Sequence, residues 1–186
     1  MKIAAILLAA GKSSRFGANK LLHPLAGTPI ALRSAASLLT ACPQAVAVVS
    51  PGSALQPLLE AAGLHAVVSE RAHEGMGESL KSAIAATPDA DGWVVALADM
   101  PYVRPATHTA IMRALADGAA IAAPVYRGER GHPVGLSARF REDLLALEGD
   151  AGARMILKSH AHEIRLVEVD DPGVLKDIDT PADLAS

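Results

Sequence analysis

The stretch LLAAGKSSRFGANK, at residues 7–20, decides how the rest of the chain is interpreted. The apolar run at residues 3–10 leads into it, and its length and continuous apolar character are typical of a buried strand in a parallel sheet. Two glycines, two serines and three cations then follow within ten residues. Backbone N–H groups in such a loop converge on an anion, and Arg15 and Lys20 would supply compensating positive charge. The stretch therefore predicts a polyphosphate-binding loop after the first strand.

Two widespread glycine-rich loops do not fit this stretch. The sequence Gly11-Lys12-Ser13 imitates the end of a P-loop, but that motif needs a glycine five positions earlier, where the chain has Ile6. The dinucleotide-binding fingerprint needs a glycine two positions before Gly11, and Ala9 stands there. The loop is therefore of a different type.

The composition excludes several classes of function. The chain has 186 residues and a formal charge of −3, so it offers no broad positive field for nucleic acid or for an acidic membrane. Cys42 is the only cysteine, which rules out internal disulfides and thiolate clusters and fits a reducing cytoplasm. The N-terminal apolar run is too short for a secretory signal, and none approaches the roughly 20 residues of a membrane span. We expect a cytoplasmic protein.

Apolar runs and amphipathic stretches alternate along the chain. This alternation is typical of an α/β fold with a parallel sheet and right-handed crossovers. The expected strands cover residues 3–10, 45–49, 64–68, 92–98, 119–125 and 164–169, and the main expected helices cover 29–41, 53–62, 74–86 and 105–116.

One carboxylate follows an expected strand directly. Asp99 comes after the run WVVALA, so it should lie at the carboxyl edge of the sheet, where ligands bind in open α/β folds. A carboxylate beside a core needs a metal ion, a cation or water, and Mg²⁺ bound with substrate phosphates satisfies it. The alternative is an aspartate that starts a turn before Pro101.

Six segments, in order, resemble those of the MobA-like nucleotidyltransferases, in the branch of the molybdopterin cytidylyltransferases (MocA). The chain departs from the pattern at Phe16, where methionine is usual, and at Ala83, where glycine is common. The segments are L-A-A-G-x-S-x-R-x-G-x-x-K at 8–20, G-M-x-x-S at 75–79, D-M-P at 99–101, R-G-x-P at 130–133, G-D-x-G-A-R at 149–154 and D-I-D-T-P-x-D-L at 177–184.

The resemblance implies a fold and an activity. The implied fold is a single Rossmann-like nucleotidyltransferase domain over residues 1–186, with a mostly parallel central sheet flanked by helices. The implied reaction transfers CMP from CTP to the terminal phosphate of molybdopterin and releases pyrophosphate. The implied partners are CTP, a molybdopterin-type cofactor, and a molybdoenzyme or its maturation chaperone, with no nucleic acid and no membrane.

The resemblance also assigns roles to residues. Lys20, Arg15 and Asp99 would be catalytic, and Asp99 and Asp179 would bind Mg²⁺. His132 and Arg154 would contact the acceptor. Ser79 also fits a purely structural role in the first turn of a helix. The implied nucleotide-binding residues are Leu8, Ala9, Ala10, Gly11, Ser13, Arg15, Lys20 and Ser79.

The base preference rests on one methyl group. Related guanylyltransferases read L-A-G-G where this chain has Ala10 before Gly11. The extra methyl fills volume and restricts the loop, which favours the smaller pyrimidine of CTP. A guanylyltransferase, a transferase acting on another phosphorylated acceptor and a non-catalytic molybdopterin carrier stay as alternatives.

Overall fold

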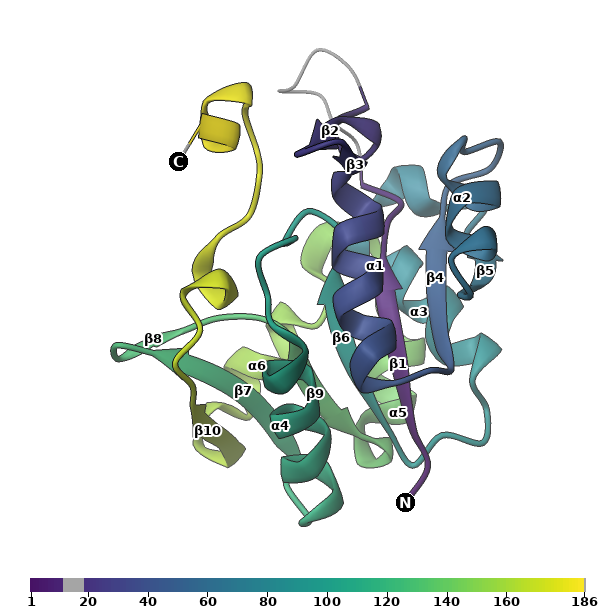
Figure 1. Ribbon diagram of the computed structural model, residues 1–186. Coiled ribbons are helices and arrows are strands. Elements are labelled where there is room, and N and C mark those ends of the chain that lie inside the picture. The colour runs from purple at the N-terminus through teal and green to yellow at the C-terminus, as the bar shows by residue number, and fades with distance from the viewer. Residues whose placement is uncertain (12–18, 186) are drawn as a thin grey trace.

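A mostly parallel sheet runs through the centre of the molecule, with helices on both faces (Figure 1). The structure is a computed structural model that describes residues 1–11 and 19–185. The strands of the main sheet are β1 (Ile3–Leu8), β4 (Ala45–Val49), β5 (His65–Val68), β6 (Gly92–Leu97), β7 (Ile121–Tyr126), β8 (Glu129–Arg130), β9 (Val134–Ser137) and β10 (Ile164–Glu168). The α-helices are α1 (Ile30–Ala41), α2 (Leu55–Ala61), α3 (Met76–Ala86), α4 (Pro105–Ala116), α5 (Arg141–Leu145) and α6 (Arg154–Ser159).

The strand order is β10-β7-β9-β6-β1-β4-β5, and β8 pairs with β7. The β1–β4, β1–β6, β4–β5 and β7–β10 pairs are parallel. Strand β9 lies antiparallel between β6 and β7, and β8 is also antiparallel. The expected α/β fold with a mostly parallel sheet is confirmed. A small hairpin of β2 (Pro24–Leu25) and β3 (Thr28–Pro29) lies apart from the main sheet.

Alternate residues of the central strands are buried against opposite helical layers. Ala5 and Leu7 of β1 pack in a core cluster with residues of α1 and α2, whereas Ile6 and Leu8 pack in a second cluster with residues of α3, α5 and α6. Helix α4 covers the β6–β7 part of the sheet on the α1 side. Burial on both faces explains why these strands are almost continuously apolar. None of the helices in residues 1–11 and 19–185 is long and apolar enough to cross a membrane.

Several elements lie close to where the sequence predicted them. The expected strand at 45–49 and helix at 105–116 match β4 and α4 at both ends. Strand β1 ends at Leu8 rather than at residue 10, and α1 starts at Ile30 with Pro29 as its N-cap. Such shifts of one or two residues are usual at the ends of strands and helices, where the regular hydrogen bonding stops.

Two strands, β8 and β9, are not among those that the sequence predicted. Strand β9 begins at Val134 and is buried between two other strands. Gly135 concealed it, because an isolated glycine weakens the appearance of a short strand. Its role is packing, since an added Cβ would lie 2.8 Å from Ile111 Cγ2 of α4.

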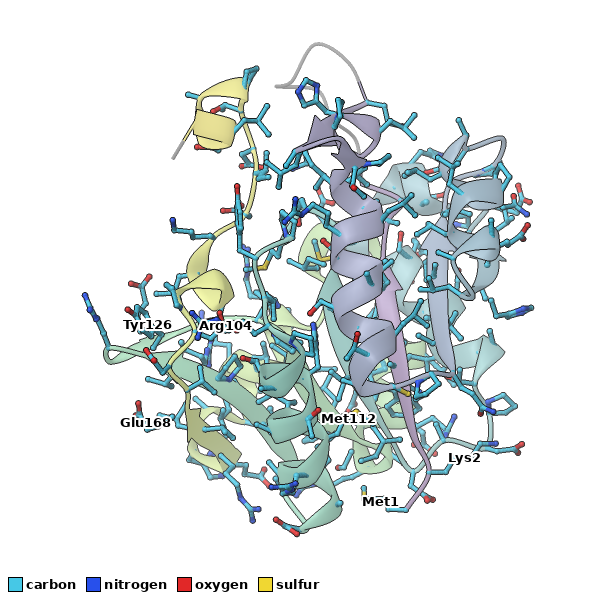
Figure 2. All side chains as sticks on the ribbon, in the orientation of Figure 1. Met1, Lys2, Arg104, Met112, Tyr126 and Glu168 are labelled. Atoms are coloured by element: carbon cyan, nitrogen blue, oxygen red, sulfur yellow. The ribbon has the colours of Figure 1, made fainter. Side chains whose placement is uncertain are left out.

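The C-terminal segment, residues 169–185, crosses back toward the first half of the chain outside the sheet (Figure 1). Asp171 anchors it near α4, where its Oδ2 accepts hydrogen bonds from Arg104 N and Thr107 Oγ1 at 2.8 and 2.6 Å. Arg104 also donates to the backbone oxygen of Asp170 and lies beside this segment (Figure 2). Further along, Ile178 is fully buried. The segment is therefore held along its length by the core.

Candidate active site

A cavity of about 550 Å³ opens at the carboxyl edge of β1 and β6. The end of β1 and the end of β6 lie side by side, because Leu8 pairs with Leu97 and Ala98 N donates to Leu8 O. This is the edge at which ligands bind in open α/β sheets. The lining residues are Leu8, Ala10, Gly11, Lys20, Leu21, Ala72, His73, Gly75, Met76, Ser79, Leu97, Asp99, Asp150, Arg154, Asp177 and Asp179.

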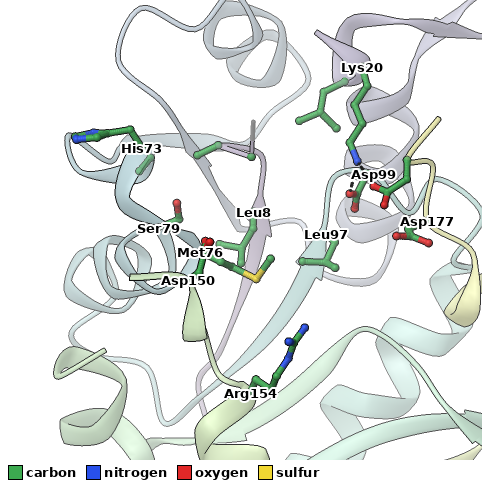
Figure 3. A pocket seen from close by; sticks show the side chains of 16 residues that line it. Leu8, Lys20, His73, Met76, Ser79, Leu97, Asp99, Asp150, Arg154 and Asp177 are labelled. Atoms are coloured by element: carbon green, nitrogen blue, oxygen red, sulfur yellow. Dashed lines mark hydrogen bonds and ion pairs between the residues drawn. The ribbon is translucent and has the colours of Figure 1, made fainter. Parts of the chain in front are cut away.

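Lys20 bridges two aspartates on one wall of this cleft (Figure 3). Its Nζ donates to Asp99 Oδ2 and to Asp179 Oδ1, each at 2.9 Å. Burial disfavours the charged ammonium, but the hydrogen bonds to Asp179 and Asp99 outweigh it and raise the pKa of Lys20 above its ordinary value. The side chain of Lys20 is only 12 % exposed, and those of Asp99 and Asp179 are 24 % and 31 % exposed. This wall therefore combines two negative charges with one positive charge.

The C-terminal segment brings Asp179 to Asp99. Ile178 N donates to the backbone oxygen of Asp99 at 2.9 Å, and the Ile178 side chain is buried in the core cluster of α1. Asp183 then holds the next turn, where its Oδ2 accepts from the backbone N–H groups of Asp179 and Thr180 and from Thr180 Oγ1. These hydrogen bonds lower the pKa of Asp183. Thr180 and Asp183 thus form a capping arrangement at the start of a 3₁₀ helix, Pro181–Ala185.

The two bridged carboxylates fit a divalent cation. Their oxygens converge on one ammonium, which stands where a positive ion would be held. Among residues 1–11 and 19–185, no group of three or more His, Cys, Asp or Glu side chains is arranged to hold a metal ion. Two carboxylates are still sufficient for Mg²⁺, which keeps waters and takes further oxygens from substrate phosphates.

The opposite wall is the start of α3. Gly75 is its N-cap, with φ of 144°, and lies so close to the backbone of Gly149 and Asp150 that no side chain would fit there. Ser79 is 4 % exposed and lines the cleft from the first turns of α3. Because Gly75 is the N-cap, Ser79 does not cap this helix. Asp150 also lines the cleft, and it does not cap α6, because the N-cap of that helix is Ala153.

A second cavity, of about 460 Å³, adjoins the first. The two cavities share Leu8, Met76, Leu97, Asp150, Arg154 and Asp177. The second has an apolar floor from β6, β9 and α3, and the polar side chains around it include Glu129, Arg130, His132 and Arg154. Arg154 faces the Lys20 wall across the opening (Figure 3).

The structure brings most of the expected site residues to these two cavities. Ala9 is the exception, because its side chain is packed in the core and its N–H donates to Val48 O. Ser13 and Arg15 lie outside the described residues. Leu8, Ala10, Gly11, Lys20, Ser79, Asp99, Arg154 and Asp179 line the first cavity, and His132 and Arg154 line the second.

Sequence reasoning missed Asp177, which lines both cavities. A signal for it was present in the run Asp177-Ile178-Asp179. In an extended segment alternate side chains point to opposite sides, so a buried Ile178 sends both neighbouring carboxylates toward the cleft.

The fold and the cleft together are those of an α/β nucleotidyltransferase. The chain belongs to the MobA-like NTP transferase family, because the model of the MobA-like NTP transferase domain matches residues 5–164. This confirms the family that the sequence motifs indicated.

Individual relatives agree with this assignment. Purine catabolism protein PucB of Bacillus subtilis (strain 168) is 34 % identical over 95 % of this chain and 91 % of its own length. The crystal structure of Rv0371c from Mycobacterium tuberculosis H37Rv is 30 % identical and superimposes with a TM-score of 0.82, over 99 % of this chain and 95 % of that one. A complex of Rv0371c with manganese has a TM-score of 0.81 at 28 % identity, over 99 % and 96 % of the two chains.

Proposed function

We propose that this protein is a cytidylyltransferase that transfers CMP from CTP to the terminal phosphate of a molybdopterin-type cofactor and releases pyrophosphate. The observation that carries the proposal is the Lys20 bridge between Asp99 and Asp179 at the carboxyl edge of the sheet. The family supplies the reaction class, and the six sequence segments supply the branch.

The reaction needs alignment and charge neutralisation more than proton transfer. A phosphate monoester is largely ionised at neutral pH, so it attacks the α-phosphorus of a nucleotide without a general base. Nucleophile, electrophile and leaving group are all anionic, so positive charge close to the phosphates is the main contribution of the protein. Lys20 supplies that charge from a flexible stem, so its ammonium can leave the carboxylates and follow a phosphate oxygen.

Asp99 and Asp179 would hold Mg²⁺, which supplies charge stabilisation between phosphate oxygens when it is bound. The proposal is supported by the convergence of both carboxylates on one cation and by the manganese complex of a relative. Lys20 then turns from the carboxylates to the nucleotide.

The acceptor would lie in the second cavity. Its apolar floor suits the flat ring system of a pterin, and Arg154, at the opening shared with the first cavity, suits a phosphate because the guanidinium fork matches phosphate oxygens. His132 would contact the acceptor from the same cavity. Ala10 lines the nucleotide side, where its methyl group favours a pyrimidine.

The test is incubation of the purified protein with each NTP, Mg²⁺ and purified molybdopterin, with pyrophosphate release followed. We expect release with CTP, and kcat/KM for CTP about 10- to 200-fold above that for GTP, the range for exclusion by one small group. Equal values or a GTP preference contradict the cytidylyltransferase branch. Release with another phosphorylated acceptor alone corrects the acceptor, and binding of molybdopterin without release indicates a carrier.

A further inference from the structure

A small cavity lies next to the second cavity, with which it shares Leu97, Met100 and His132. It is bounded by α1, α4, the end of β6 and the start of β9, and its volume is about 10 Å³. That is close to the space that one buried water molecule needs. The lining residues are Ser34, Ala96, Leu97, Met100, Val103, His108, His132 and Pro133.

Two histidines on this lining carry unsatisfied ring nitrogens. His108 is 2 % exposed. The Nδ1 atoms of His108 and His132 are sealed from solvent, and neither has a hydrogen-bond partner within the described part of the chain. Buried polar atoms in native proteins almost always have a partner, either protein or ordered water. Two such atoms around one cavity of this size therefore point to a shared partner.

Both rings are neutral at neutral pH. Burial lowers the pKa of His108 to about 4 and also lowers the pKa of His132. In a neutral imidazole, Nδ1 donates in one tautomer and accepts in the other, and a water molecule can complement either.

Ser34 offers a third contact on the same lining. Its Oγ donates to Ala98 O at 2.9 Å and also lies 3.4 Å from Ile30 O, so its lone pairs are available to accept. Buried waters typically make about three hydrogen bonds. No carboxylate or thiol is among the residues that line this cavity, so a metal cation would have no charge partner there.

We infer that one buried water molecule binds between His108 Nδ1, His132 Nδ1 and Ser34 Oγ, and that it fixes the His132 ring from behind. His132 also lines the second pocket. His108 is therefore a positioning residue that acts on the acceptor side through water, without contact with the acceptor. This functional consequence rests on the proposed acceptor site, whereas the water site does not.

Two variants of His108 test the water site directly. The amide of His108→Asn keeps a polar atom where Nδ1 stands, whereas His108→Leu removes it at similar volume. Ile111→Val, one turn further along α4, is the matched control for packing because Ile111 is fully buried and apolar. The readout is the Nδ1 resonance of His132 in protein labelled with ¹⁵N-histidine, assigned with His132→Gln, together with a high-resolution crystal structure of the wild type.

We expect one ordered water within hydrogen-bond distance of both Nδ1 atoms. The His132 resonance should shift in His108→Leu and stay unchanged in His108→Asn and Ile111→Val. A crystal structure without that water, or a His108→Leu spectrum equal to that of Ile111→Val, overturns the inference.

Kinetics test the positioning role separately. His108→Leu should raise KM for the acceptor several-fold and leave KM for CTP unchanged, and His108→Asn should restore the acceptor KM. Equal changes in both KM values overturn the positioning role. If the wild type transfers no cytidylyl group, the proposed function fails while the crystallographic and spectroscopic result on the water stands.

Discussion

Lys20 holds a positive charge between two carboxylates. Its stem carries the ammonium to Asp99 Oδ2 and Asp179 Oδ1, and the three groups are mostly shielded from solvent. Removing one partner from such a group leaves uncompensated charge, which is more costly than never forming the group. Lys20 thus has two roles, one as the charge partner of the carboxylates and one toward the nucleotide, and a substitution can separate them.

Lys20→Met should lower kcat more than it raises KM for the nucleotide, because the ammonium acts most strongly on the charge that develops during transfer. In the nucleotide-free variant the affinity for Mn²⁺ should rise, since no ammonium competes for the carboxylates. Steady-state kinetics and a Mn²⁺ titration by electron paramagnetic resonance measure the two effects. Lys158→Met, on an exposed part of α6, is the matched control. Weaker Mn²⁺ binding in Lys20→Met would mean that the two carboxylates serve only to bind Lys20 and do not hold a metal ion.

Asp99→Asn keeps the shape of the side chain and an oxygen that accepts from Lys20, but it removes the charge. We expect kcat to fall by about 10²-fold or more, the scale for loss of one electrostatic contact in a transition state. Asp179→Asn should instead raise the Mg²⁺ concentration needed for half-maximal rate. Metal titrations and thermal melts of both variants, beside Asp117→Asn at the exposed end of α4, distinguish these effects from unfolding. Wild-type turnover in Asp99→Asn would remove it from the mechanism.

At the scale of elements, the apolar periodicity of the sequence predicted those helices and strands whose formation depends on local sequence. Strand β4 and helix α4 have apolar patterns and flanking residues that are sufficient on their own, so their bounds agree with expectation. Strand β9 has four residues, one of them a glycine, and it forms because β6 and β7 pair with it on both sides. Such pairing depends on contacts distant in sequence, which no local pattern encodes.

The site residues also divide into those that local sequence predicts and those that depend on contacts distant in the chain. Asp99 could be predicted because it follows a strand directly. The Lys20 bridge could not, because it depends on how the C-terminal segment returns to the sheet. Asp177 was missed for a different reason. The run 177–179 places both aspartate side chains on one side of the segment only if Ile178 is buried on the other, and its burial is not evident from the sequence.

The junction between α3 and the segment at residues 148–150 is a close backbone contact beside the cleft. Gly75→Ala adds a methyl group that meets the backbone of Gly149, at a φ of 144° that side chains rarely adopt. We expect a loss of about 3 kcal/mol in the free energy of unfolding, from strain and overpacking together. Gly118→Ala has φ of 88° and open space around it, so it should lose only about 1 kcal/mol. Urea titrations measure both, and equal losses would show that the close packing contributes nothing.

At the scale of the whole molecule, buried histidines make stability depend on pH. Burial lowers the pKa of His108 from 6.5 to about 4, so the unfolded state binds more protons between these values. The free energy of unfolding therefore falls as pH falls through this window, by roughly 3 kcal/mol at most from this group. His132 acts in the same direction.

His108→Asn should flatten this dependence, because the amide does not titrate. The measurement is urea unfolding at several pH values between 7 and 4, with the exposed His65→Asn as control. The wild type and His65→Asn should show the same slope. An unchanged slope in His108→Asn would mean that the ring is protonated in the folded protein without penalty.

The bridge at Lys20 has a consequence for the order of folding. Its hydrogen bond to Asp179 joins residues 159 positions apart in the chain. Paired residues of β1 and β6, such as Ile3 and Gly92, are 92 − 3 = 89 positions apart, so closing the bridge to Asp179 demands more chain entropy than pairing those strands. The single tryptophan, Trp93, is fully buried in β6 and reports formation of the sheet. In stopped-flow refolding, recovery of Trp93 fluorescence should precede recovery of binding to a fluorescent CTP analogue, and one common rate would contradict this order. During synthesis the sheet would then assemble first, and Asp99 would gain its partner carboxylate, Asp179, only after residue 179 has left the ribosome.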